Sequence, residues 1–213
     1  MSVRTRIPVI ADDVDTAVRL AVDTLGAVTD ADWDAQAASL EWTCRETLEH
    51  LADDLFFYAA QIGPRRRPAT APVRFAFTAR RPGGPVNLVF AAPDAGPEDL
   101  LQVVETCGAL LTAMTRTTPP DVRAYHVYGV SDPEGFAAMG IVETLVHLYD
   151  LGQTLGFDVD PPADLCDRVL RRLFRDAPLD TDRWATLLWA CGRVPLGDRP
   201  RRAEWRWDGT TLD

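Results

Sequence analysis

Residues 133–155 place the strongest constraint on the fold, because their pattern predicts a helix that is buried on every side. Apolar residues go almost all the way round the helical wheel of this segment, and a helix of that kind normally lies inside a protein. Asp132 is a good N-cap, Pro133 suits the first helical position, and Gly156 suits the residue that ends a helix. We therefore expect this helix at the centre of the molecule.

Two polar residues, Glu143 and His147, interrupt the apolar segment. They are four residues apart and so lie on one face of the helix. A buried, unpaired carboxylate costs on the order of several kcal/mol, so Glu143 needs a partner. A divalent metal ion bound by both side chains would satisfy them together. A simple Glu–His pair on a helix surface is the alternative.

His50 is the candidate for a third ligand. It lies in the middle of a second predicted helix, residues 44–62, where Thr43 and Glu46 form a capping box. Two histidines and one carboxylate are a common ligand set for a catalytic divalent ion with an open position. Ligands on facing helices of a bundle can meet at one ion. The alternative for His50 is a histidine that packs in the core.

The remaining patterns are also mainly helical, and we predict an all-α four-helix bundle with extra short helices. Residues 73–91 are predicted to form a small hairpin or an ordered loop, and Glu204–Asp208 a terminal strand or a packed arm. Apolar stripes with their caps and stops predict the other helices over residues 11–28, 97–117, 162–175 and 181–192.

Composition excludes several classes of function. The formal net charge of −10 repels phosphate backbones, so we expect no nucleic-acid partner. All 22 basic residues are arginine, which excludes a Schiff-base lysine and a phosphate-loop lysine. None of the three serines lies in a G-x-S-x-G motif, so nothing supports serine-hydrolase chemistry.

Cysteine usage and hydropathy predict a cytoplasmic protein. Acidic residues interrupt the N-terminal segment too early for a signal peptide. No apolar run approaches the ~20 residues that a membrane span needs, so we expect no membrane partner. The cysteines form no C-x-x-C pair and are typical of isolated apolar residues in a reducing compartment; they are Cys44, Cys107, Cys166 and Cys191.

Two segments resemble a known family. Around His50 the sequence reads WTCRETLEHLADDLFFYAAQ, and around Glu143 and His147 it reads GFAAMGIVETLVHLYDLGQTLG. Over roughly residues 10–160 the chain resembles the DinB-like, mycothiol-dependent maleylpyruvate isomerase family, whose members are metal-binding four-helix bundles found in actinobacteria. The resemblance implies that the three residues named above bind the metal.

On this basis we divide the chain in two. Residues 1–160 are expected to form the metal-binding bundle, and residues 161–213 a C-terminal helical extension packed on the same domain. Zinc is the expected metal, although nickel, manganese, iron and cobalt accept the same ligands.

The resemblance also implies a reaction. Members of the family use the metal to bind and activate a low-molecular-weight thiol, usually mycothiol, which then adds to a small electrophile. In the type member a separate C-terminal domain contributes to the active site, whereas about 55 residues follow Gly156 here. An S-transferase is therefore favoured over maleylpyruvate isomerisation, and another thiol-dependent isomerase remains open.

His126 and Asp150 are candidates for catalytic support. His126, in the loop before the buried helix, could act as an acid or a base, could position the thiol, or could cap the backbone. Asp150 lies about one turn beyond His147 and could either orient that ligand or be a helix-end charge.

Three charged residues of the second helix have other expected roles. Arg45 could hold a carboxylate of the substrate or the thiol, or could pair within the protein. Asp53 and Asp54 follow His50 and are expected to face solvent.

Two other functions compete with the thiol-dependent enzyme. A metal-binding bundle without catalysis could act as a stress-related binding protein. A bundle that has lost its metal would leave Glu143 and His147 merely paired. The sequence leaves open the substrate and whether the chain forms a homodimer.

Overall fold

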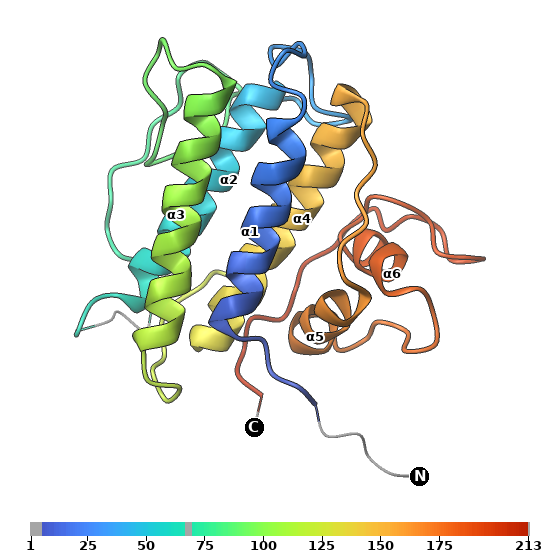
Figure 1. The fold of residues 1–213 in the computed structure, drawn as a ribbon. Coiled ribbons are helices and arrows are strands. Elements are labelled where there is room, and N and C mark those ends of the chain that lie inside the picture. Colours follow the sequence, from blue (N-terminus) through green and yellow to red (C-terminus); the bar gives the residue numbers. More distant parts are fainter. Residues whose placement is uncertain (1–5, 67–69, 213) are drawn as a thin grey trace.

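The computed structural model describes residues 6–66 and 70–212, and within them the protein is all-α (Figure 1). No sheet is formed in this part of the chain, which confirms the predicted fold class. None of its helices is long and apolar enough to cross a membrane. The helices are α1 (Ala11–Gly26), α2 (Cys44–Ile62), α3 (Pro97–Thr117), α4 (Pro133–Leu155), α5 (Ala163–Leu173) and α6 (Arg183–Ala190).

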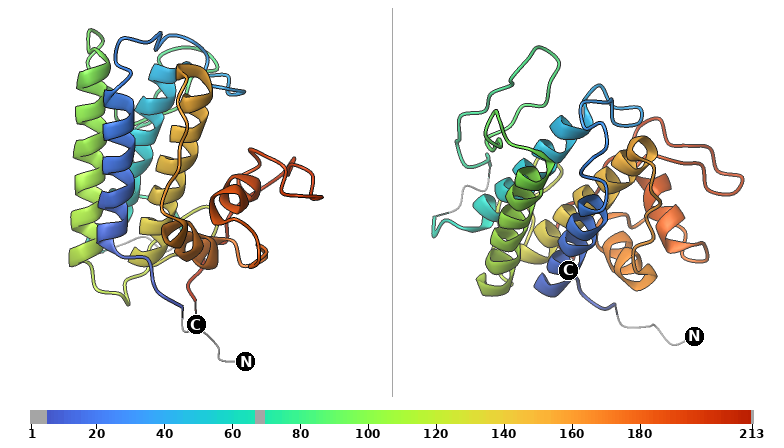
Figure 2. Two further views of the ribbon diagram at one scale, coloured as in Figure 1. Left: turned by 45° about the vertical axis from the view of Figure 1, so that its right-hand side comes forward. Right: turned by 45° about the horizontal axis from the view of Figure 1, so that its top comes forward.

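The four longest helices form the bundle, and the two short ones lie beside it (Figures 1 and 2). α1 packs on α3 and α4, and α2 packs on the same two helices, so α4 borders both α1 and α2. The apolar residues between these helices form one continuous core. This arrangement places α2 and α4 side by side, with their polar residues facing each other.

α4 is the buried helix that its apolar pattern predicts. Its side chains are inaccessible along almost its whole length, for example at Phe136 and Leu145. It begins where Asp132 accepts a hydrogen bond from the Gly135 amide at 2.7 Å, and it ends at Gly156, whose φ of +84° is left-handed. Both ends therefore follow the local signals in the sequence.

α2 starts at the predicted capping box. The Glu46 amide donates to Thr43 Oγ1 at 3.2 Å, and the Thr43 amide donates to Glu46 Oε2 at 3.0 Å. The preceding turn and part of the loop that follows α2 both contact this helix: the Arg45 amide donates to the Trp33 carbonyl at 2.9 Å, and the Leu88 amide donates to Oδ1 of Asp53 at 2.6 Å. In that loop, Thr78 and Asn87 form an isolated antiparallel bridge without strands, so of the two forms expected for residues 73–91, a small hairpin or an ordered loop, the structure has the ordered loop. The bridge holds Asn87 beside α2.

The segment after α4 packs against the bundle. α5 packs on α4, and α6 packs on α5. Residues 204–208 form a packed arm without a strand: the Asp208 amide donates to the Leu173 carbonyl at 2.9 Å, and Trp207 is buried. The fully buried Arg172 links the residues just after this arm to the start of α4, because its guanidinium contacts Asp132 at 2.9 Å and the Thr210 carbonyl at 3.1 Å.

Candidate functional site

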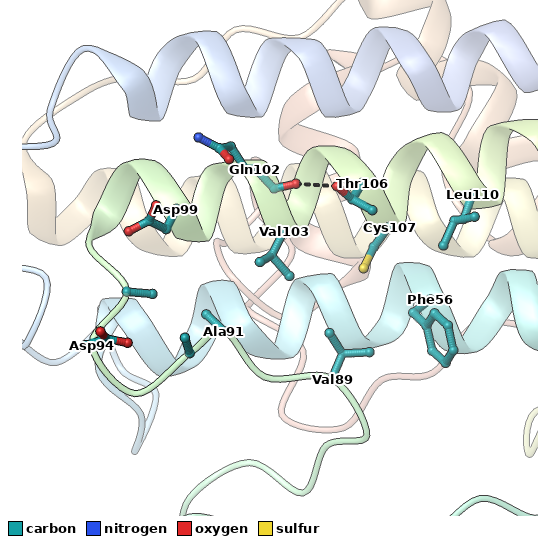
Figure 3. A pocket seen from close by; sticks show the side chains of 12 residues that line it. Phe56, Val89, Ala91, Asp94, Asp99, Gln102, Val103, Thr106, Cys107 and Leu110 are labelled. Atoms are coloured by element: carbon teal, nitrogen blue, oxygen red, sulfur yellow. Dashed lines mark hydrogen bonds between the residues drawn. The ribbon is translucent and has the colours of Figure 1, made fainter.

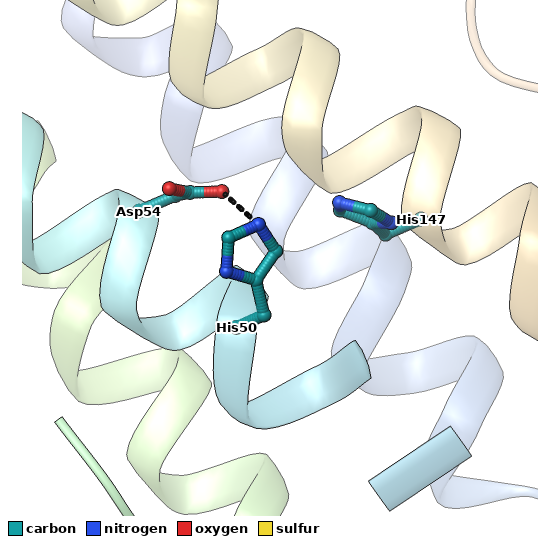
Figure 4. Close-up of side chains that lie close together, drawn as sticks. All are labelled: His50, Asp54 and His147. Carbon is teal, nitrogen blue, oxygen red and sulfur yellow. Dashed lines mark ion pairs between the residues drawn. The ribbon is translucent and has the colours of Figure 1, made fainter. Parts of the chain in front are cut away.

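The candidate site lies between α2 and α4, where two histidines face each other (Figure 4). His50 comes from α2, and Asp54 follows it by one turn on the same face. His147 comes from α4, and the centroids of the two imidazole rings are 5.6 Å apart. Ligand atoms of these three residues all lie within 4.8 Å of one another. The fold thus brings together the two histidines that we expected to share a metal ion.

Each histidine faces a carboxylate on its own helix. Nε2 of His50 lies 3.3 Å from Oδ2 of Asp54, and Nε2 of His147 lies 3.3 Å from Oε2 of Glu143. Both are pairs of residues four apart, so α2 and α4 each present one histidine and one carboxylate. In this conformation Asp54, rather than Glu143, completes the group whose ligand atoms lie closest together.

The outer nitrogens of the two rings face hydrogen-bond acceptors. Nδ1 of His50 is hydrogen-bonded to the amide oxygen of Asn87 at 3.3 Å, whereas Nδ1 of His147 lies 3.4 Å from Oδ2 of Asp150, at ion-pair distance but without the geometry of a hydrogen bond. Such oxygens only accept hydrogen bonds, so in a neutral ring the proton belongs on Nδ1 and the lone pair on Nε2. Both lone pairs then point toward the carboxylates.

Lone pairs and carboxylates that face one volume repel one another unless a cation lies among them. Oδ2 of Asp54 is buried and has no hydrogen-bond partner in the part of the chain that the structure describes. Imidazole nitrogens and carboxylate oxygens are common ligands of zinc and other divalent first-row ions. The residues present therefore fit a divalent metal ion.

Burial and neighbouring charges set the protonation of this cluster. Burial, together with the charge of His147, lowers the pKa of His50 to about 4. Burial also acts to lower the pKa of His147, but contacts with Asp150 and Glu143 outweigh it and raise this pKa to about 9. Burial and the nearby Glu143 raise the pKa of Asp54. A divalent ion would thus compete with a proton on His147.

The expectation that Asp53 and Asp54 face solvent is wrong. Asp53 is buried and accepts hydrogen bonds from the amides of Leu88 at 2.6 Å and Val89 at 2.8 Å. Asp54 turns into the cluster (Figure 4). Its spacing of four residues from His50 is the same signal that singled out the Glu–His pair in α4, so the sequence contained the information.

His126 reaches the histidine–carboxylate cluster only through one intervening side chain, that of Tyr58. Its ring is buried against Tyr58, whose hydroxyl donates to Oε1 of Glu143 at 3.4 Å. Nδ1 of His126 accepts a hydrogen bond from the Tyr128 amide at 3.1 Å, and Trp207 from the C-terminal arm packs on the same ring. Burial lowers the pKa of His126 to about 4.

Asp150 and Arg45 occupy different surroundings. Asp150 is buried beside His147, and both of its oxygens also face Arg193. The pKa of Asp150 is lowered, because contacts with these two residues outweigh its burial. Arg45 instead donates to the Ala95 carbonyl at 2.7 Å and lies 3.6 Å from Asp34, near the start of α3.

A separate groove of about 690 Å³ lies between α2, α3 and the loop that precedes α3 (Figure 3). Its lining is mainly apolar and includes Phe56, Val89 and Val103, with the Cys107 side chain directed toward α2. No residue of the histidine–carboxylate cluster lines this groove. We therefore treat it as distinct from the candidate site.

The fold and the cluster define a class: helical bundles with a candidate divalent-metal site between two helices. Residues 14–152 match the family described as the mycothiol maleylpyruvate isomerase N-terminal domain. Since this match spans well over half of the chain, the protein belongs to that family. No curated protein and no solved structure matches the chain. The matched range contains the histidine–carboxylate cluster and ends before α5.

Proposed function

We propose that the protein is a metal-dependent enzyme that uses a low-molecular-weight thiol, mycothiol first of all, to attack a small electrophile in the cytoplasm. The observation that carries the proposal is that ligand atoms of His50, Asp54 and His147 lie within 4.8 Å of one another, with Oε2 of Glu143 3.3 Å from Nε2 of His147. The thiol is suggested by the family, which is named for a mycothiol-linked isomerase.

In this proposal His50, Glu143 and His147 hold the ion, with zinc as the default and nickel, manganese, iron or cobalt as alternatives. A divalent ion supplies one effect: it lowers the pKa of a bound thiol and holds it as the thiolate. Asn87 holds the His50 ring in place through its contact with Nδ1, the ring nitrogen that faces away from Asp54. The Trp42 ring packs edge-on against the His50 ring, with 4.7 Å between the ring centroids.

The cysteines of the protein are unsuited to the nucleophilic role, which supports an external thiol. All four are buried and free. Burial raises the pKa of Cys44 and Cys107 to about 11 and that of Cys166 to about 12, and it raises the pKa of Cys191 as well. Buried neutral thiols are inert, because the thiolate is the reactive form.

The proposed reaction begins with a bond between the thiol sulfur and an electrophilic carbon. In S-transfer, the leaving group departs with its electron pair as that bond forms, and the thiol proton passes to the medium. In isomerisation, the thiolate adds to one carbon of a carbon–carbon double bond as the π electron pair moves onto an adjoining electron-accepting group of the substrate. Rotation then occurs about the resulting single bond, and the double bond forms again as the thiolate leaves. We assign Asp150 to the orientation of His147 and His126 to the support of Glu143 through Tyr58. Arg45 stays our candidate for a carboxylate of the thiol or substrate.

A metal-binding protein without catalysis is the second candidate, and one observation favours it. Asp54 could serve as a fourth protein ligand, because its Oδ2 atom is buried at the cluster without a hydrogen bond in the described chain. Four protein ligands saturate a tetrahedral zinc ion, as in structural sites, whereas catalytic sites keep one position open. The two candidates therefore differ in whether an external thiol can reach the metal.

A cobalt-substituted protein tests this difference. We expect mycothiol to produce a sulfur-to-metal charge-transfer band in the near ultraviolet, and we expect the protein to accelerate the reaction of mycothiol with a bimane electrophile. His147→Ala, loaded under the same conditions, serves as the control and should show neither effect. Full cobalt occupancy with no band at saturating thiol would reject the enzyme and favour the closed, non-catalytic site.

A further inference from the structure

Asp150 links His147 to a residue outside the bundle. Its Oδ2 atom lies 3.4 Å from Nδ1 of His147 and accepts a hydrogen bond from Nη2 of Arg193 at 2.7 Å. Its Oδ1 atom accepts a second hydrogen bond from Nε of Arg193 at 3.1 Å. The carboxylate is thus held at both oxygens by one planar guanidinium, a geometry that fixes its orientation.

The backbone beyond α6 directs Arg193 to this position. The Gly192 amide donates to the Trp189 carbonyl at 3.0 Å, and the Arg193 amide donates to the Leu188 carbonyl at 2.8 Å. This is the hydrogen-bond pattern of a Schellman motif, which ends a helix and reverses the chain. Gly192 has a φ of +67°, and a Cβ atom there would lie 2.7 Å from the Trp205 ring. A glycine is therefore required to turn Arg193 back toward α4.

Arg193 is enclosed once it reaches α4. Its side chain is 13% exposed, its Nη1 atom donates to the Cys191 carbonyl at 2.9 Å, and the Trp205 ring lies 5.6 Å from the guanidinium. Asp150 is itself buried, so its charge depends on a partner. Arg193 supplies that partner from beyond the range matched by the family, which ends at residue 152.

We infer that Arg193 is a positioning residue for the metal centre, acting through Asp150 on the ring of His147. The inference rests on the proposed metal site. A ligating histidine usually donates its other ring N–H to a carboxylate, which fixes the ring and directs the free lone pair at the metal. Metal binding by this chain therefore depends on the segment after α6, as well as on the bundle that carries the ligands.

The test is the affinity for Co²⁺, measured by titration of the full chain and read from its visible absorption bands. Arg193→Met removes the guanidinium and keeps most of the aliphatic stem, and we expect a loss of about 10- to 100-fold in affinity. Arg193→Lys keeps the charge and loses the two-pronged contact, so it should recover part of this loss. Arg202→Met is the matched control: Arg202 lies in the same segment, pairs with Asp176 and stacks on Trp189, and its loss should leave the affinity nearly unchanged.

Asp150→Asn separates positioning from a general effect on folding. If Arg193 acts through Asp150, Arg193→Met should cost little further affinity in the Asp150→Asn background, and thermal unfolding should show that each variant is folded. Equal affinities of wild type and Arg193→Met would overturn the inference and leave the metal site standing. If the losses of Co²⁺ affinity caused by Arg193→Met and Asp150→Asn were fully additive in the double variant, the inference would also be overturned. A folded wild type that binds no Co²⁺ would overturn both the inference and the proposed function.

Discussion

Oδ2 of Asp54 lies 3.3 Å from Nε2 of His50, one turn away on α2, and it makes no hydrogen bond within the described residues. A buried carboxylate oxygen without a hydrogen bond is costly unless a cation shares its site. The same volume is faced by His147. This relationship makes Asp54 a functional candidate that destabilises the metal-free protein.

The first prediction concerns Asp54→Asn, which preserves size and removes the charge. Burial raises the pKa of Asp54. An acid whose folded pKa lies above its unfolded value costs stability once the pH exceeds the unfolded pKa. At neutral pH the metal-free variant should therefore melt at a higher temperature than wild type. Its affinity for Zn²⁺ or Co²⁺ should fall about 10-fold or more.

The control for this prediction is Asp53→Asn. Asp53 binds the amides of Leu88 and Val89 through Oδ1 instead of the cluster, and an Asn side chain keeps an oxygen acceptor for both amides, so its replacement should leave the metal affinity nearly unchanged whatever its effect on the melting temperature. Calorimetry with and without metal measures both quantities. If Asp54→Asn were less stable than wild type without metal and bound the metal with normal affinity, that result would contradict the placement of Asp54 at the metal site.

The helices were predictable because their signals are local. The capping box of Thr43 and Glu46 marks the start of α2, and Gly156 marks the end of α4, both as the structure has them. The apolar surface all round α4 also predicted its central place in the bundle. These features depend on residues within a few positions of one another.

The surroundings of the cluster were less predictable because they depend on distant segments. Asp53 is buried by a loop 35 residues further along the chain, and no local pattern of α2 reveals that loop. Arg193 contacts Asp150 across 43 residues of sequence. It does so because the chain reverses direction after α6 in the Schellman motif at Gly192. Sequence patterns predicted the two histidines and the glutamate; the fold brings the histidines together and places the glutamate beside His147, and distant segments supply the residues that contact them.

A second prediction concerns pH and His126. Burial lowers the pKa of His126 to about 4, well below the ordinary value of about 6.5. The unfolded chain therefore binds a proton that the folded chain refuses, so stability is present above the unfolded pKa and is lost as the pH falls toward the folded pKa. Between about pH 7.5 and about pH 5, this residue should account for a loss of about 2 kcal/mol.

His126→Gln isolates that contribution from those of the other titrating groups. Urea unfolding at both pH values should show that the variant loses about 2 kcal/mol less than wild type on acidification. Because each protein is compared with itself at the two pH values, any effect of the substitution on the free energy of unfolding that does not depend on pH cancels. An identical loss in the two proteins would mean that His126 is protonated freely in the folded state.

A third prediction concerns the attachment of the C-terminal segment. Arg172 is fully buried and contacts Asp132, which caps α4, and the Thr210 carbonyl. Removing one partner of a buried ion pair typically costs about 3–5 kcal/mol, so Arg172→Ala should lower the free energy of unfolding by about that amount. Arg171→Ala removes only a more exposed pair with Asp167 and should cost under about 1 kcal/mol. Similar small losses in both variants, measured by urea unfolding, would contradict this account of the contact.

The central claim is that one divalent ion binds between α2 and α4. The most direct measurement is elemental analysis of protein purified without chelators, for wild type and for His147→Ala. We predict close to one equivalent of metal per chain in wild type and a loss of most of it in the variant, because the remaining ligands rarely retain an ion against buffer. A wild-type chain without metal, or a variant with the same content as wild type, would contradict the claim.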